Sequence, residues 1–159
     1  MVTIDMNDML NDAFHQAVFL DETALKAFMN PEDPNYLKAR SVFHELDDME
    51  RLLITTNVVI FDTHQWLKKA SSYTEAEFFI NTIDKAVALD KLMIIPGSST
   101  TEKESRQLLI DCPQFEFSLS EAMTAVVMIT HQIKRIFTFN RSYSALPQMF
   151  TEIKIIPSW

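Results

Sequence analysis

The chain has 159 residues, 47% of them hydrophobic, which suits one globular domain with a full core. Its formal net charge of −8 disfavours sequence-independent binding along a nucleic-acid backbone, although local basic residues and a bound cation can still admit nucleic acid to one pocket. A single glycine, Gly97, excludes the dinucleotide fingerprint and the phosphate-cradling loop, which need two or more glycines at fixed offsets.

The sequence predicts a soluble, cytoplasmic protein without membrane contact. Its first fifteen residues have neither the basic start nor the unbroken apolar core of a secretory signal, and nowhere do about 18 apolar residues follow one another. The lone cysteine, Cys112, is interpreted as a small hydrophobic residue rather than a nucleophile. Structural or surface roles are predicted for the histidines, which lack the spacing of a metal-binding pair: His15, His44, His64 and His131.

The chain is expected to start with a helical extension over residues 1–16. Its amphipathic pattern rests on five residues: Met6, Met9, Leu10, Ala13 and Phe14. A first strand is predicted at Ala17–Leu20. Asp33, placed before Pro34, is expected to cap a helix whose apolar residues recur three or four apart as far as Leu46.

The middle of the chain predicts two strands with two helices between them. The strands are Arg51–Thr55 and Lys91–Ile95, both short apolar runs. Thr56 is expected to cap a helix over 57–69, and Thr74 a second helix that carries apolar residues on one side.

Two further helices and two strands are predicted in the last third of the chain. Thr101 with Glu104 resembles a capping box, and Ser120 is expected to cap a helix ending near His131. The last strands are predicted at Arg135–Phe139 and Glu152–Ile156, the latter at a sheet edge because Pro157 ends it.

Strands separated by one or two helices favour parallel pairing through helical crossovers. The expected fold class is therefore α/β, a three-layer α/β/α sandwich around a mostly parallel sheet of about five strands, in one domain over 1–159. In such sheets the ligand crevice lies beyond the carboxyl ends of the strands. Asp21 directly follows the first predicted strand, and Asn140 the fourth.

Two more acidic residues, Asp62 and Glu121, complete a candidate site of four residues with Asp21 and Asn140. Each of the four also has a purely structural interpretation. Asp62 lies among Val59, Ile60 and Phe61 on a largely apolar helix face, where burial of an unpaired carboxylate is costly. Glu121 opens a helix, where the helix dipole alone favours an acid. Taken singly, Asp21 is interpretable as a turn or capping residue after a strand, and Asn140 as a turn former. Only the four together are informative.

Together these segments resemble the PIN domain family, the fold of the VapC-type toxin ribonucleases. The resemblance covers most of the chain from Ala17 to Pro157. The segments that carry it are FLDETALKAF, DPNYLKARSVF, ITTNVVIFDT, SLSEAMTAVVM and IFTFNRSY. Three positions depart from the family pattern: the second acid, usually Glu, is Asp62; the third, usually Asp, is Glu121; the fourth, usually Asp, is Asn140. The last change removes a charge.

The resemblance implies a metal-dependent endoribonuclease that hydrolyses RNA phosphodiester bonds, the toxin of a toxin–antitoxin pair. Asp21, Asp62 and Glu121 would hold Mg²⁺ or Mn²⁺, and Asn140 would complete the catalytic set by accepting a hydrogen bond from water. The alternative is a catalytically impaired protein of the same fold that binds RNA or a protein. A phosphatase of the haloacid-dehalogenase type fits poorly, because Thr23 stands where it needs a second aspartate.

Further residues near the acids are candidates for supporting roles. Hydroxyl groups that would orient the acids are expected from Thr23, Thr124 and Ser142. Phosphate contacts are expected from Lys134, Arg135 and Arg141, with a solvated rim as the plainer interpretation. From the resemblance alone we also expect an RNA substrate, a homodimer and a small antitoxin protein as partner.

Overall fold

The structure is a computed structural model that describes residues 14–158. The helix predicted in the N-terminal extension therefore falls outside the described residues, apart from its last position, Phe14.

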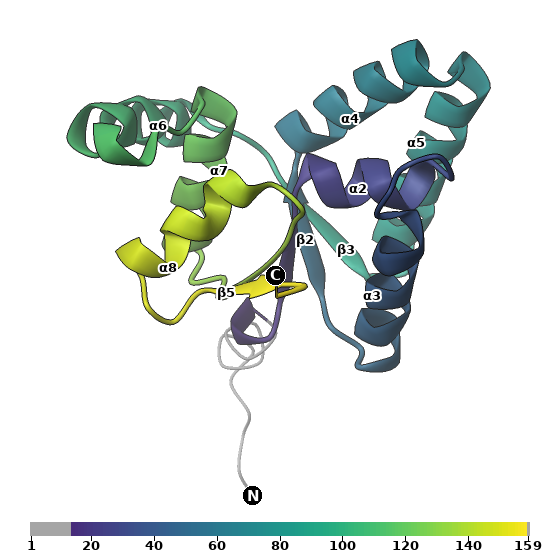
Figure 1. The fold of residues 1–159 in the computed structure, drawn as a ribbon, viewed down its shortest axis with the longest axis horizontal. Coiled ribbons are helices and arrows are strands. Elements are labelled where there is room, and N and C mark those ends of the chain that lie inside the picture. Colours follow the sequence, from purple (N-terminus) through teal and green to yellow (C-terminus); the bar gives the residue numbers. More distant parts are fainter. Residues whose placement is uncertain (1–13, 159) are drawn as a thin grey trace, which may run out of the picture.

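Five short strands form one parallel sheet in the order β3-β2-β1-β4-β5 (Figure 1). The strands are β1 (Val18–Leu20), β2 (Leu53–Thr56), β3 (Leu92–Ile95), β4 (Arg135–Phe137) and β5 (Lys154–Ile156). The predicted sheet, its parallel pairing and the edge position of the last strand are confirmed. The fourth strand was predicted too long, because Thr138 and Phe139 already leave β4. These two residues therefore lie in the loop that follows the carboxyl end of β4.

Helices cover both sides of the sheet, as the sandwich prediction requires. They are α2 (Glu22–Met29), α3 (Tyr36–Asp48), α4 (Asn57–Ala70), α5 (Tyr73–Ala88), α6 (Ser99–Asp111), α7 (Leu119–Thr130) and α8 (Leu146–Met149), with the 3-10 turns η1 (Pro113–Phe115) and η2 (Arg141–Ala145). In Figure 1, α2 to α5 lie to the right of the sheet and α6 to α8 to its left. Sequence analysis did not predict α2, which begins immediately after Asp21.

Several helix starts lie a few residues before the predicted ones. Ser72, Ser98 and Ser118 are the residues whose hydroxyls accept the capping hydrogen bond, so the predictions for Thr74, Thr101 and Ser120 were wrong. Helix α3 is capped at Asn35, and Asp33 instead accepts the Asn35 N–H in a turn. Only Thr56 was placed correctly. Neighbouring serines and threonines are chemically equivalent caps, and tertiary packing decides which of them is used.

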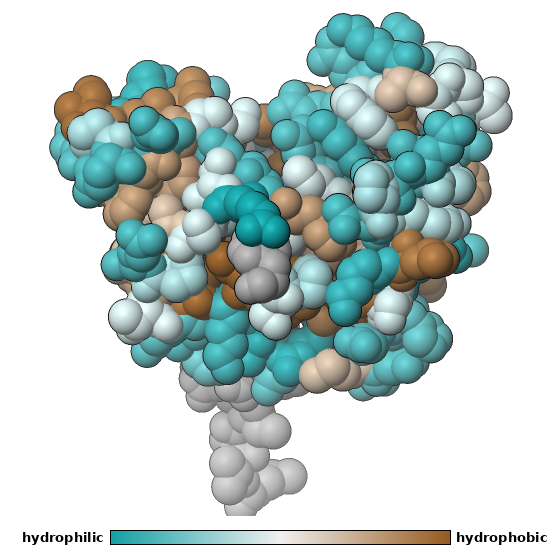
Figure 2. Space-filling view, in the orientation of Figure 1, coloured by the Kyte–Doolittle hydropathy of each residue, from teal (hydrophilic) through white to brown (hydrophobic). Residues whose placement is uncertain are grey.

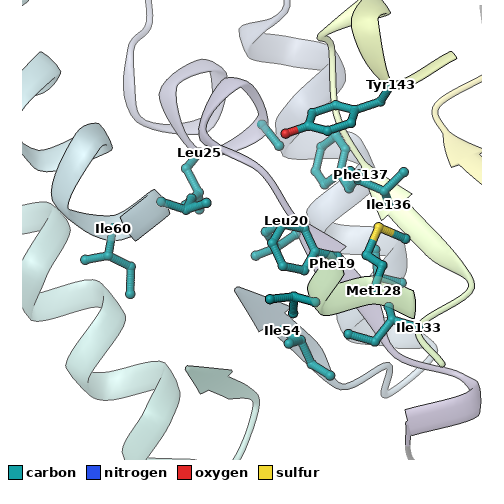
Figure 3. Close-up of a cluster of buried hydrophobic side chains, with 14 of the residues drawn as sticks. Phe19, Leu20, Leu25, Ile54, Ile60, Met128, Ile133, Ile136, Phe137 and Tyr143 are labelled. Atoms are coloured by element: carbon teal, nitrogen blue, oxygen red, sulfur yellow. The ribbon is translucent and has the colours of Figure 1, made fainter. Parts of the chain in front are cut away.

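The core lies between the central strands and the helices that flank them (Figure 3). Figure 3 shows side chains of β1, β2 and β4 stacked between Leu25 and Ile60 on one side and Met128 and Ile133 on the other. Phe19 of β1 and Ile54 of β2 are fully buried. Because β1 has a strand on either side and a helix layer on each face, all three of its residues are apolar.

The surface in the view of Figure 1 mixes hydrophilic and hydrophobic side chains (Figure 2). Hydrophobic surface shows at the upper left, over α6, and the outline dips between the α6 side and the α4 side. None of the helices within residues 14–158 is both long enough and apolar enough to span a bilayer.

Replacing Ile54 with alanine should lower the free energy of unfolding by about 2 to 5 kcal/mol, because the surrounding layers cannot close the cavity. Met93→Ala on the edge strand β3, where the side chain is 37% exposed, should cost less than half as much. Urea unfolding of both variants measures the difference. Equal losses would show that the core is not centred on β1 and β2.

Candidate active site

A pocket of about 200 Å³ lies at the carboxyl ends of β1, β2 and β4. Its lining comes from four parts of the chain: Asp21, Glu22, Thr56, Val58, Val59, Asp62, Ser118, Ser120, Glu121, Met123, Thr124, Asn140 and Tyr143. All four residues of the predicted candidate site are among them. The lining holds four carboxylates and no lysine or arginine within the described residues, so it attracts cations.

Thr55, Thr56 and Asn57, called here the TTN segment, fix where α4 starts and hence where Asp62 lies. The Thr55 hydroxyl donates to the Leu20 carbonyl at 2.8 Å, which ties β2 to the end of β1. Thr56 caps α4 through the Val59 N–H, and Asn57 accepts the Gly97 N–H at 3.0 Å. Three consecutive polar side chains thus anchor one helix start to two neighbouring segments.

Asp21 is the most buried of the acids, with 2% of its surface exposed. Its Oδ1 accepts the Ala24 N–H at 3.0 Å, so it caps α2. The hydroxyls of Thr23 and Thr138 also donate to this carboxylate, at 2.7 and 2.5 Å. Burial raises the pKa of Asp21 to about 6, against the lowering effect of these hydrogen bonds. Near neutral pH the fold therefore holds a buried carboxylate that is largely ionised.

Asp62 projects from α4 at the side of the pocket and is only partly buried. The expected burial on an apolar helix face was wrong, because the neighbouring Phe61 is 65% exposed and α4 leaves this side open. Partial burial raises the pKa of Asp62, as does the negative charge of Glu22, while Lys26 opposes both. Asp62 is thus a carboxylate that both the pocket and the solvent can reach.

Glu121 forms a capping box with Ser118 at the start of α7. Its Oε1 accepts the Ser118 N–H and its Oε2 accepts Asn140 Nδ2, both at 2.7 Å. Burial raises the pKa of Glu121, but the hydrogen bonds from Ser118, Asn140 and Ser142 outweigh it and leave the pKa below its ordinary value. Both oxygens of this carboxylate are therefore engaged within the protein.

Asn140 uses both ends of its amide. The Oδ1 atom accepts the Ser142 N–H at 3.0 Å and so caps η2, while Nδ2 donates to Glu121. These two partners fix the amide orientation, since the N–H requires an acceptor and the carboxylate a donor. An aspartate at this position can make the first bond but not the second, so the charge lost here is replaced by a hydrogen bond to a neighbouring acid.

Two ionisable residues of the pocket, Glu22 and Tyr143, were not predicted from the sequence. Glu22 lies beside Asp21 and forms an ion pair with Lys26 at 3.2 Å. Tyr143 is buried; burial and the charge of Asp21 hold its pKa well above the ordinary value, against a lowering hydrogen bond with Thr124. Its hydroxyl therefore stays a proton donor near the acids. The only sequence signal for Tyr143 was the aromatic position three residues after Asn140.

The predicted supporting residues divide into two groups. Thr23, Thr124 and Ser142 each contact a pocket residue through their side chains, as described above. Lys134 and Arg135 lie at the opposite, amino end of β4, where Lys134 pairs with Glu152 at 2.8 Å and Arg135 donates to the His15 carbonyl. Their predicted phosphate contacts at this pocket do not agree with that placement. Arg141 follows Asn140 directly and is exposed.

The donor set suits a hard divalent cation, because Asp21, Asp62 and Glu121 offer carboxylate oxygens in one pocket. Within residues 14–158, however, no three acidic, histidine or cysteine side chains converge closely enough to hold one ion between them. Hydrogen bonds hold Glu121 toward Ser118 and Asn140. The pocket fits the cation in the chemistry of its donors, and each Glu121 oxygen keeps a lone pair beyond the hydrogen bond that it accepts.

Comparison with known proteins supports the fold. No protein-family model matches the sequence, and no curated protein matches it either. Among solved structures, the chain is similar to VapC20 of Mycobacterium tuberculosis, a sarcin-ricin loop cleaving toxin, with a TM-score of 0.68 and 19% identity. The similarity covers 81% of this chain and 94% of that chain. The predicted PIN-like, VapC-like fold is thereby confirmed.

Replacing Asp21 with asparagine should stabilise the metal-free protein near neutral pH. The folded pKa of about 6 exceeds the reference value of 3.8, so the contribution of Asp21 to stability is complete below pH 3.8 and is lost as the pH rises through 6. The variant avoids this loss, which amounts to at most about 3 kcal/mol.

Urea unfolding in EDTA at about pH 7.5 and about pH 4 measures the effect. The advantage of the variant over the wild type should appear at the higher pH and fade at the lower one. Asp84→Asn, at an exposed position of α5, controls for the change in net charge. A variant less stable than the wild type at both pH values would contradict the prediction, because it would show that the fold stabilises the ionised carboxylate of Asp21.

Proposed function

We propose that this protein is a divalent-metal-dependent endoribonuclease in which Asp21, Asp62 and Glu121 bind Mg²⁺ or Mn²⁺. The observation that carries the proposal is the pocket at the carboxyl ends of the parallel strands, with four carboxylates and no cationic lining residue. The PIN-like fold adds support, because the similar protein VapC20 is a toxin that cleaves the sarcin-ricin loop.

The acids differ in what they contribute. A bound divalent ion would polarise the phosphoryl oxygen and activate water for in-line attack. Asp21 supplies a carboxylate held in place by Thr23, Thr138 and the start of α2, so its position costs no reorganisation on binding. Asp62 supplies a partly exposed carboxylate on the opposite wall. Tyr143 supplies a neutral hydroxyl able to donate a hydrogen bond to a phosphate oxygen.

Asn140 makes this site weaker than one with a fourth carboxylate. A carboxylate about 6 Å from a divalent ion, at an effective dielectric between about 20 and 80, contributes on the order of 1 to 5 kcal/mol of attraction. Its replacement by an amide weakens ion binding by roughly tenfold to a thousandfold.

The hydrogen bond from Asn140 to Glu121 supports a second candidate, a protein of this fold that no longer cuts and instead binds RNA or a protein. With Ser118 and Asn140 on its two oxygens, Glu121 is satisfied without a metal ion. The two candidates differ in their response to Asn140→Asp. An impaired nuclease should gain activity, whereas a binding module should not.

The biological setting follows from the fold similarity alone. On this proposal the protein is the toxin of a toxin–antitoxin pair, acts on RNA in the cytoplasm as a homodimer, and is held inactive by a small antitoxin. The similarity to a VapC toxin supports the RNA substrate and the antitoxin partner in general terms, and the homodimer is part of the proposal alone.

Calorimetric titration with Mn²⁺ should detect binding by the wild type that Asp62→Asn abolishes. Asn140→Asp should tighten binding by tenfold or more on the estimate above, because it adds a charge. In Mn²⁺-dependent cleavage of a mixed RNA substrate, Asn140→Asp should be the most active, the wild type less active, and Asp62→Asn the least active.

Asp84→Asn on α5 is the matched control and should bind as the wild type does. Mn²⁺ binding that is unaffected by Asp62→Asn would remove the pocket from the proposal. A folded wild type and a folded Asn140→Asp variant that both leave RNA intact at high concentration would favour the binding module.

A further inference from the structure

A second cavity, of about 280 Å³, adjoins the acidic pocket. It is lined by Val58, Glu102, Arg106, Leu119, Ser120 and Met123. Three of these, Val58, Ser120 and Met123, also line the acidic pocket, so the two cavities share a wall. Glu102 and Arg106 place this cavity against α6, which lies on the same side of the sheet as α7 in Figure 1.

The walls of this cavity differ from those of the acidic pocket. Leu119 is 49% exposed at the start of α7, ahead of the buried run that begins at Ala122. Met123 and Val58 extend the apolar lining toward the acids. Arg106 lies exposed on α6 and takes part in none of the ion pairs within residues 14–158. The cavity therefore combines an open apolar wall with an unpaired guanidinium.

These two features match the two halves of a nucleotide. A base seeks a flat apolar surface, and a phosphate seeks a cation, which arginine engages with two parallel hydrogen bonds. The four carboxylates of the acidic pocket repel the phosphates that flank the reacting one, and the positive charge of Arg106 offsets this repulsion. Lys134 and Arg135 cannot offset it from the opposite end of β4.

We propose that this cavity is a nucleotide subsite for single-stranded RNA, which receives the nucleotide next to the scissile phosphate. The base packs on Leu119 and Met123, and its phosphate binds Arg106. Glu102, one turn before Arg106 on α6, faces the same space and can accept a hydrogen bond from a ribose hydroxyl or a base amino group. The subsite rests on the proposed function, since it presumes an RNA substrate.

Fluorescence anisotropy with a labelled single-stranded RNA of about 12 mixed nucleotides, in EDTA, tests the subsite. EDTA prevents metal-dependent cleavage, and a gel confirms that the RNA stays intact. At about 50 mM salt, Arg106→Gln should weaken binding about threefold to tenfold and should reduce the slope of log affinity against log salt by about 0.7. Leu119→Ala should weaken binding by a similar factor at all salt concentrations, because its contribution is apolar.

Lys85→Gln is the matched control, because it removes one positive charge from an exposed position in the last turn of α5. If Arg106→Gln and Lys85→Gln bind RNA alike, the subsite is overturned. Absence of RNA binding by the folded wild type, both in EDTA and with Ca²⁺ in its place, overturns it as well. RNA binding that depends on Arg106 and Leu119 supports the subsite even if Mn²⁺ brings no cleavage, in which case only the nuclease proposal fails.

Discussion

The buried carboxylate of Asp21 is the interaction on which the site depends. It caps α2, accepts the Thr138 hydroxyl, and thereby holds the segment after β4 against the end of β1. The Thr138 oxygen in turn accepts the Asn140 N–H, and Asn140 donates to Glu121 at the start of α7. One chain of hydrogen bonds thus runs from the central strand through the loop to the third acid. Asp62 stands outside it, anchored separately by the TTN segment.

This network explains why an amide is compatible with the fourth position. In a cluster of carboxylates without a bound ion, each added negative charge raises the cost of keeping the others ionised. Asn140 instead gives Glu121 a donor and helps to hold its pKa below the ordinary value. The arrangement lets the protein form a well-satisfied site without a fourth negative charge, through a hydrogen bond that an ionised aspartate could not donate.

The sequence predicted the sheet and the composition of the site well, because both depend on short-range signals. Apolar runs bounded by polar residues marked the strands, and an acid directly after a strand marked Asp21. The start of α2 was missed because Asp21 was considered as a site residue while its capping role was only one alternative. The serine caps were misplaced because neighbouring hydroxyl residues satisfy the same rule. Glu22, Tyr143 and Arg106 could not be assigned, since their positions depend on how separate helices pack around the pocket.

The bond between Thr138 and Asp21 joins residues 117 positions apart, and β1 pairs with β4 over a similar separation. The central strand therefore lacks one neighbour until β4 (Arg135–Phe137) has left the ribosome, and Asp21 lacks one of its donors until Thr138 has followed. Domains fold during synthesis only once their distant partners are available. A growing or truncated chain that stops before β4 carries Asp21 and Asp62 but neither Glu121's amide partner nor the loop that positions it. The order of synthesis thus delays assembly of the acidic pocket until β4 and the loop that follows it are available to close it.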